Sequence, residues 1–135
     1  MGTQETLLSI SQASKLTELT AKSIRLYEEK GILSPPVRGE NGYRYYTQHH
    51  IDELRLIARA KRVGFSLEEC KALVLLSNDP NRESVQVRDR AKEKLHYVQN
   101  KISELKLMEQ QLQQWIAECP GDKGSHCPII DDLTR

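Results

Sequence analysis

The residues with the clearest chemical potential are two cysteines near the C-terminal end of the chain. Cys119 and Cys127 flank a short segment that contains Gly121 and Gly124, so the two thiols can turn toward each other. Thiolates are soft ligands that favour Cu(I), Zn(II) and iron–sulfur clusters. Zinc sites usually need four ligands and iron–sulfur clusters need four cysteines, whereas two thiolates satisfy a monovalent d¹⁰ ion. The pair therefore favours Cu(I), with Ag(I) or Au(I) as chemical surrogates.

Other uses of these residues stay open. The two thiols could form a reversible disulfide in a redox switch, take another metal such as Au(I) or Zn(II), or simply pack as small hydrophobic groups. His126 is expected to be an exposed loop residue, with a role as a third or transient ligand as the alternative. Cys70 lies in an apolar helical pattern and is expected to pack in the core. Adjacent residues rarely orient as nucleophile and base, so we expect no enzyme built on Cys127 and His126.

The size and charge of the chain narrow its class. Its 135 residues suit a small DNA-binding domain with an extension, and its net charge of +1 requires any attraction to nucleic acid to come from a local basic face. No segment is apolar enough to span a bilayer, and residues 1–10 lack the pattern of a secretory signal. The odd number of cysteines argues against a disulfide scaffold. We therefore expect a cytoplasmic protein without membrane association, in which residues 1–8 form a loose leader.

Residues 1–80 predict a winged helix-turn-helix DNA-binding domain. Ser11 is expected to cap a first helix that buries Leu16, and Thr20 a second helix that ends at Gly31. Two short helices separated by a tight turn are typical of the helix-turn-helix.

A hairpin is predicted to follow as the wing. Val37–Arg38 and Tyr43–Tyr46 are its expected strands, joined through Asn41-Gly42. This dipeptide favours a two-residue turn in which both central residues have a positive φ.

Two more helices are expected before residue 80. Thr47 caps the first, which Gly64 ends, and Ser66 with Glu69 forms a capping box that starts the second. Residues 78–80, Asn-Asp-Pro, are expected to end that helix.

A long helix is predicted from about Ser84 to Cys119, where the sequence has neither glycine nor proline. Apolar residues recur there at alternating intervals of four and three, with Glu109 as the polar interruption. This seam consists of Ala91, Leu95, Val98, Ile102, Leu105, Leu112 and Ile116. One apolar stripe cannot be buried against itself, so residues 81–118 are expected to form a dimerisation helix that pairs with a second copy. Residues 119–135 are expected to form a metal-binding loop and a short helix from Pro128.

Basic side chains gather on the predicted helix-turn-helix and wing. Lys22 and Arg25 lie on the exposed side of the second helix, and Arg38 and Arg44 flank Tyr43 in the hairpin. The third helix and its end add Arg55, Arg59, Lys61 and Arg62. Such groups can bind phosphates on both sides of a DNA groove.

Several of these segments together resemble the MerR family of bacterial regulators over about residues 8–133. They are SIRLYEEKGI from Ser23, then Arg38 with NGYRYY from Asn41, and RVGFSLEE from Arg62. The resemblance implies a mainly α protein: a winged helix-turn-helix DNA-binding domain, a long dimerisation helix in an antiparallel coiled coil, and a C-terminal metal-binding loop with a short helix. The implied DNA-contact residues are Lys22, Arg25, Tyr27, Arg38, Tyr43 and Arg44. One departure is Glu18, where relatives often have glycine, and a positive φ would strain it.

The segment CPGD…CPII resembles the copper-responsive branch of this family, in which the ion binds between the two cysteines that correspond to Cys119 and Cys127. The zinc-responsive branch carries further cysteines at the positions of Glu118 and Ser84, and Pro120 fits the copper type better than gold-selective relatives. The resemblance thus implies a DNA-distorting regulator that senses Cu(I) and activates copper efflux and detoxification promoters.

The implied partners are double-stranded promoter DNA with a palindromic operator, a second copy of the chain in a homodimer, and RNA polymerase. The metal-bound dimer would kink and untwist the DNA and so realign promoter elements that lie too far apart. We hypothesise that ordering of residues 119–127 docks Ile129, Ile130 and Leu133 against the dimerisation helix. This packing would supply the difference in metal affinity between the two states that any such shift requires.

Overall fold

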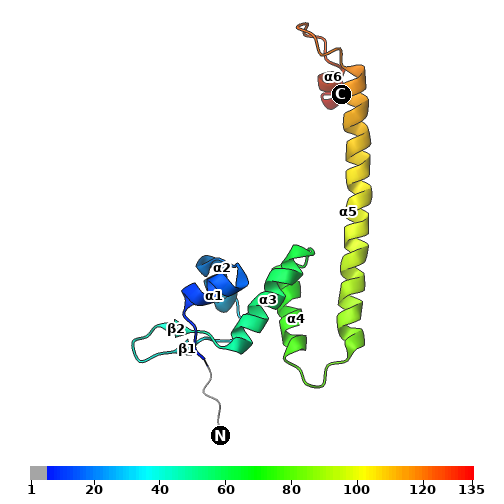
Figure 1. Cartoon of the computed structure of the whole chain (residues 1–135). Coiled ribbons are helices and arrows are strands. Elements are labelled where there is room, and N and C mark those ends of the chain that lie inside the picture. The colour runs from blue at the N-terminus through cyan, green and yellow to red at the C-terminus, as the bar shows by residue number, and fades with distance from the viewer. Residues whose placement is uncertain (1–5) are drawn as a thin grey trace. The chain divides into compact units, whose positions relative to one another are not determined.

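The computed structural model describes residues 6–135, and this part of the chain is mainly helical (Figure 1). The helices are α1 (Ile10–Thr17), α2 (Ala21–Glu29), α3 (Gln48–Arg62), α4 (Leu67–Ser77), α5 (Ser84–Glu118) and α6 (Pro128–Leu133). The strands β1 (Val37–Arg38) and β2 (Arg44–Tyr45) pair antiparallel, Val37 opposite Tyr45. The chain forms two compact units, one up to Ala91 and one from Lys92, so the boundary falls inside α5. Within residues 6–135, no helix has the length and apolar character needed to cross a membrane.

The first helix begins earlier than the sequence indicated. Ser9 is its N-cap, with a side chain that accepts a hydrogen bond from the Gln12 backbone, and the Gln12 side chain accepts one from the Ser9 backbone. The prediction that Ser11 caps this helix is therefore wrong, because the reciprocal box with Gln12 satisfies two exposed donors at once. With this start, Leu16 is 49% exposed and not buried, and Thr17 takes the inward position. Thr20 caps α2 as predicted.

Part of the expected loose leader is ordered. Leu8 forms a two-way backbone bridge with Tyr46, with both N···O distances at 2.8 Å, and its side chain packs against the core. The expectation of a loose segment over residues 1–8 is therefore wrong at Leu8, and its residues 1–5 lie outside the described part of the chain.

The wing is a hairpin, but its turn differs from the predicted type. Gly42 has a φ of +80°, whereas Asn41 does not have a positive φ. The Gly42 amide donates to the Gly39 carbonyl at 2.9 Å, so the turn spans Gly39 to Gly42, and the Gly39 amide donates to the Tyr43 carbonyl. This is a longer loop closed by one left-handed glycine, stabilised by a hydrogen bond from the Tyr43 backbone to the Asn41 side chain.

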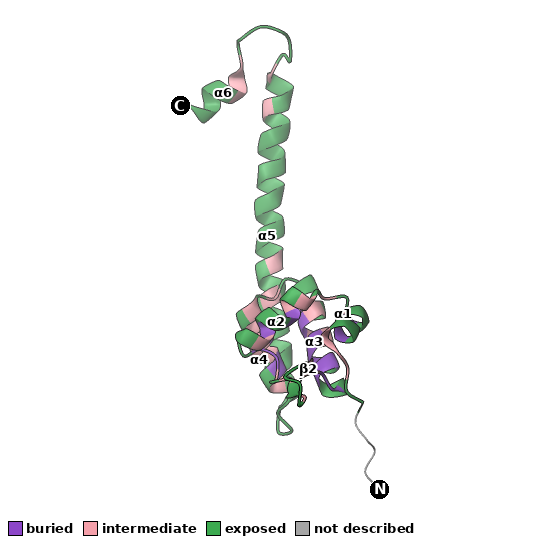
Figure 2. Ribbon diagram, turned by 90° about the vertical axis from the view of Figure 1, so that its left-hand side faces the viewer, coloured by how far each residue is buried: buried purple, intermediate pink, exposed green. Residues whose placement is uncertain are grey.

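The remaining caps of the first unit agree with the sequence. Thr47 caps α3, Ser66 and Glu69 form the predicted capping box of α4, and Asn78 is its C-cap. Gly64, with a φ of +98°, ends α3 as predicted. The buried apolar residues of the described chain all lie in this unit, as Figure 2 shows. They are Ala13, Ile24, Tyr27, Ile32, Leu33, Tyr46, Ile51, Leu54, Ile57, Ala60, Cys70 and Val74.

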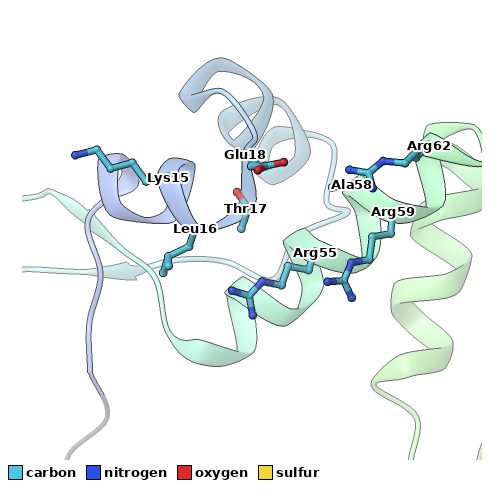
Figure 3. Close-up of a pocket in the computed structure, with 8 residues that line it drawn as sticks. All are labelled: Lys15, Leu16, Thr17, Glu18, Arg55, Ala58, Arg59 and Arg62. Carbon is cyan, nitrogen blue, oxygen red and sulfur yellow. The ribbon is translucent and has the colours of Figure 1, made fainter.

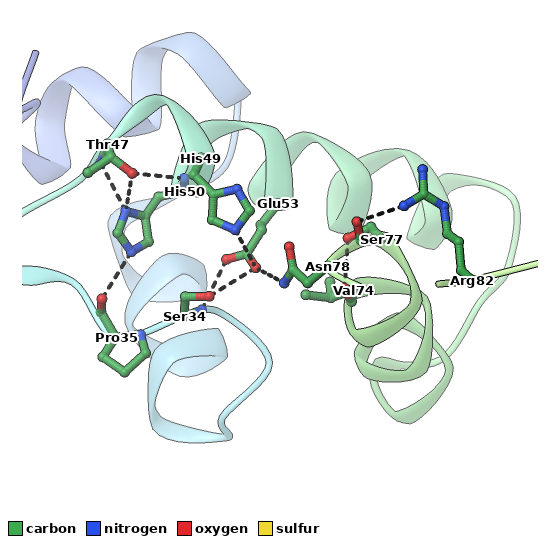
Figure 4. Close-up of polar contacts among 10 residues, drawn as sticks. All are labelled: Ser34, Pro35, Thr47, His49, His50, Glu53, Val74, Ser77, Asn78 and Arg82. Carbon is green, nitrogen blue, oxygen red and sulfur yellow. Dashed lines mark hydrogen bonds and ion pairs between the residues drawn. The ribbon is translucent and has the colours of Figure 1, made fainter. Parts of the chain in front are cut away.

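A buried carboxylate joins three segments of this unit (Figure 4). Glu53 of α3 is 2% exposed and accepts hydrogen bonds from the backbone and hydroxyl of Ser34 and from the Asn78 side chain. Beside it, His50 accepts from the Thr47 backbone through Nδ1 and donates to the Pro35 carbonyl through Nε2. Buried polar groups must be paired, and here that pairing fixes the chain leading into the wing and the end of α4.

In the second unit, α5 continues to Glu118 and α6 folds back beside its last turns (Figure 1). The Trp115 indole donates to the Asp132 carboxylate at 2.7 Å, which fixes α6 to α5. The apolar seam of α5 is exposed apart from the half-buried Val98, and none of its residues is buried within one chain. A long apolar stripe left in water is unfavourable, so this helix requires a partner surface.

Candidate functional site

The exposed side of α2 presents two basic residues. Ile24 and Tyr27 turn inward and are buried, which leaves Lys22 and Arg25 exposed on the opposite side, as predicted. The Thr20 cap sets where this helix begins and thus which side chains face out.

Tyr27 lies differently from the other predicted DNA-contact residues. It is 4% exposed, and burial raises the pKa of its hydroxyl above the usual range. The hydroxyl lies beside the Ser23 side chain near the start of α2. The ring of Tyr27 packs in the hydrophobic core, so any contact of this residue with DNA would be made by its hydroxyl.

The wing supplies two arginines and an exposed aromatic ring. Tyr43 is 68% exposed, next to Arg44 at the start of β2. Arg38 of β1 donates to the Gly42 carbonyl at 3.1 Å and lies 3.8 Å from the Glu28 carboxylate, while Arg44 Nε lies 3.0 Å from the same carboxylate. The wing is thus tied to α2 through a single acidic side chain.

One cleft brings the two predicted basic elements together. It is lined by Arg25 of α2, by Arg38, Tyr43 and Arg44 of the wing, and by Ser9 at the start of α1, among others. Three guanidinium groups around one cleft favour an anion such as a DNA phosphate. The structure therefore assembles four of the six predicted DNA-contact residues in one place.

A second basic cleft lies between α1 and α3 (Figure 3). Arg55, Arg59 and Arg62 line it from α3, and Lys15 and Glu18 from α1 and the turn that follows. Within residues 6–135, none of these four basic side chains makes an ion pair or hydrogen bond. The cluster predicted on the third helix is thus available to a polyanion.

The two C-terminal cysteines flank the loop between α5 and α6. Cys119 extends the hydrogen-bonding pattern of α5, with its amide donating to the Trp115 carbonyl at 3.0 Å, and Cys127 is the N-cap residue of α6. Gly121, with a φ of +65°, provides the turn between them. Both cysteines are reduced and partly buried. The two predicted soft donors thus lie at the two ends of one short loop, where α5 ends and α6 begins.

His126 and Cys70 occupy the environments expected for them. His126 lies in the loop with a 77% exposed side chain, 4.0 Å from the Asp131 carboxylate. Cys70 is fully buried, and burial raises the pKa of its thiol, so it stays protonated and unreactive. In the part of the chain that the structure describes, no group of three or more His, Cys, Asp or Glu side chains is placed to hold a metal ion.

Two features of these sites were not evident from sequence. Glu28 lies between the wing arginines, and the Trp115–Asp132 hydrogen bond links α5 to α6. In each of these contacts the two residues are 10 or more positions apart in the chain, which is farther than the three- or four-residue spacing of a helix can indicate. For the contact of Glu28 with the wing arginines, the sequence did offer one signal: an acidic residue among the basic residues predicted to face DNA.

Comparison with known proteins gives concordant results. Residues 8–76 match the family model described as MerR HTH family regulatory protein, and residues 51–115 match the one described as MerR, DNA binding. HTH-type transcriptional regulator CueR of Vibrio cholerae is 64% identical over 126 residues, which cover 93% of this chain and 91% of that protein. The regulator of the same name from Salmonella typhi is 52% identical over 94% of this chain and 92% of that protein.

A solved structure resembles the whole fold. The transcription regulator PbrR691 from Ralstonia metallidurans, determined in complex with lead(II), has a TM-score of 0.82 and 26% sequence identity to this chain. The match covers 93% of this chain and 98% of that one.

Proposed function

Because the chain belongs to the MerR HTH family of regulatory proteins, it is a DNA-binding transcriptional regulator, and we propose that its effector is Cu(I), bound by Cys119 and Cys127. Ag(I) and Au(I) would bind as surrogates. The regulated promoters would be those of copper efflux and detoxification genes.

The observation that carries this proposal is the donor set. Two reduced, partly buried thiols stand at the two ends of one glycine-containing loop, and the third cysteine is fully buried elsewhere. Two thiolates match the preference of a monovalent d¹⁰ ion, whereas zinc usually takes four ligands. The high identity to proteins named CueR supports the same assignment.

The proposed DNA interface consists of α2, the wing and the cleft between them. Lys22, Arg25, Arg38, Tyr43 and Arg44 would contact the duplex, with Tyr27 adding only its hydroxyl edge. Phosphate contacts of this kind fix the position of the protein on DNA, and contacts from α2 to the base edges supply sequence information.

The proposed assembly is a cytoplasmic homodimer on a palindromic operator. The unburied seam of α5 supports self-association, since a second copy offers the same stripe in return. An antiparallel pair of these helices would give the DNA-binding units a two-fold relation that a palindrome repeats. The dimer would act on RNA polymerase through the shape of the promoter DNA.

Metal would act by shifting the dimer between two states. A bound ion joins the end of α5 to the start of α6 and so restricts α6 relative to α5. Cu(I) can change transcription only if it binds the activating state more tightly than the repressing one. Packing of α6 in the metal-bound state would supply that difference.

Anaerobic titration tests the metal assignment. The purified wild-type protein should bind one Cu(I) per chain with the ultraviolet absorption of a thiolate complex, and should hold it against an excess of Zn(II). The Cys119→Ser/Cys127→Ser double variant should lose this binding and copper-dependent transcription. Cys70→Ala is the matched control and should retain both.

Two outcomes would contradict the proposal. One is normal copper induction by the double variant, and the other is tighter binding of Zn(II) than of Cu(I). A redox switch would predict no response to copper under strict reductant, so a copper dose-response of transcription under these conditions separates that alternative.

A further inference from the structure

Glu28 makes the contacts that join α2 to both strands of the wing. Its side chain is 14% exposed, and its Oε1 accepts a hydrogen bond from Arg44 Nε at 3.2 Å. The other oxygen, Oε2, lies 3.0 Å from the same nitrogen, and Arg38 Nη2 lies 3.8 Å from Oε1. One carboxylate on α2 therefore faces an arginine from β1 and an arginine from β2.

The way Arg44 is held leaves its phosphate-binding edge free. The hydrogen bond to Glu28 comes from Nε, and within residues 6–135 neither terminal nitrogen of Arg44 makes a hydrogen bond. Arginine presents its donors in a rigid planar fork, so fixing Nε also fixes the direction of the terminal nitrogens. Arg38 is held differently, since its terminal nitrogens are the ones engaged: Nη1 donates to the Gly42 carbonyl and Nη2 faces Glu28.

Arg44 cannot leave Glu28 at low cost. Glu28 Oε2 is buried and, among the described residues, has no well-aligned hydrogen-bond donor, and the nearby Tyr46 hydroxyl is buried and unpartnered as well. Without Arg44 this largely buried carboxylate would be compensated only by Arg38 at 3.8 Å, which is unfavourable. Arg44 is therefore expected to stay on Glu28 and to bind a phosphate only where its terminal nitrogens already point.

We infer that Glu28 is a positioning residue that sets how well the wing discriminates the operator from other DNA. It holds Arg44 by a hydrogen bond, faces Arg38 and cancels part of the charge of both arginines. A phosphate in the correct place is therefore bound, and general attraction to the DNA backbone is reduced. The inference rests on the proposed function, because it concerns the same DNA-binding surface.

Removing the charge of Glu28 should change the affinity for the operator and the affinity for DNA of arbitrary sequence by different amounts. In Glu28→Gln the positive charge of the two arginines would no longer be partly cancelled and Arg44 would be less restrained, so binding to a duplex of arbitrary sequence should tighten by about three- to tenfold. Its dependence on salt should steepen, by a slope of about 0.9 for each additional phosphate bound. Binding to the operator should gain less or weaken, and the ratio of the two affinities should fall by about tenfold.

The experiment uses a duplex that the full-length wild-type protein selects from a random library, and a scrambled duplex of the same composition. Dissociation constants for both are measured over a range of salt concentrations. Glu29→Gln is the matched control, since Glu29 is the next residue on α2, is exposed and makes no ion pair within the described chain. It should change both affinities equally and leave their ratio intact.

A second variant keeps the test independent of folding defects in the first. Arg44→Lys retains the positive charge but has no Nε to be held, so the affinity ratio should fall as in Glu28→Gln. The double variant should be no worse than either single one, because the two residues act as one unit.

The outcomes distinguish failure of the proposed function from failure of the positioning role of Glu28. If the wild-type protein selects no sequence from the library, the proposed function fails. If it selects one but Glu28→Gln behaves like Glu29→Gln, or loses affinity for both duplexes in parallel, the positioning role is overturned. Additive effects of Glu28→Gln and Arg44→Lys would overturn it equally.

Discussion

Glu18 connects α1 to α2 with a φ of 60°, and it is the one non-glycine residue with a positive φ among residues 6–135. A side chain in this left-handed region brings Cβ too close to the backbone and costs about 1 kcal/mol. The expectation that Glu18 carries strain is thus confirmed in its geometry. Its carboxylate also lines the basic cleft between α1 and α3, so charge and backbone effects have to be separated.

Glycine at this position should stabilise the protein relative to alanine. Glu18→Gly should unfold in urea with a free energy about 1 kcal/mol higher than Glu18→Ala, because both variants lose the carboxylate and only alanine keeps Cβ. Equal stabilities for the two variants would show that the backbone at residue 18 is unstrained.

At the scale of elements, α6 is the segment that metal binding would move. It is fixed to α5 through Trp115 and Asp132, but Ile130 and Leu133 are 56% and 61% exposed within one chain. Beside Trp115, α5 carries a shallow apolar groove lined by Leu107, Met108 and Leu112. The hypothesis that α6 docks its apolar side on the dimerisation helix therefore remains a prediction, with an apolar surface available for it.

A charge on that side of α6 should uncouple sensing from DNA binding. Ile130→Asp should abolish copper-dependent transcription in a reporter assay while operator affinity stays within about twofold, because burial of an unpaired carboxylate opposes docking. Lys123→Asp places a negative charge in the loop but outside α6, and it should retain induction. Copper induction that survives Ile130→Asp would refute the docking hypothesis.

For the whole molecule, the decisive feature is the seam of α5. Leu105 is 60% exposed and Leu112 is 54% exposed within one chain, so their burial must come from another surface. A seam residue in a coiled coil contributes several kcal/mol, and a charge there opposes pairing.

Leu105→Asp should therefore convert the protein from dimer to monomer in sedimentation experiments and weaken operator binding by at least tenfold. Asn100→Asp introduces the same charge on the side of α5 away from the seam, and it should remain dimeric. A dimer that persists in Leu105→Asp would place the self-association surface elsewhere.

Much of this architecture follows from interactions over three or four residues, and such features could be predicted. The caps at Thr20, Thr47 and Ser66, the end of α3 at Gly64, and the start of α6 at Pro128 depend on side chains beside the backbone groups that they satisfy or replace. The long helix was likewise visible, because the apolar spacing and the lack of glycine and proline define it, whereas the role of the cysteine pair stays a prediction.

Tertiary packing decided the rest. The bridge of Leu8 to Tyr46, the burial of Tyr27 and the hold of Glu28 on two wing arginines all join segments that are distant in sequence or depend on which side of a helix faces the core. The choice of Ser9 over Ser11 as the first cap was local by contrast, since the box with Gln12 spans only three residues. Local rules specify where elements begin and end, whereas the burial of polar and charged groups is settled only when distant segments meet.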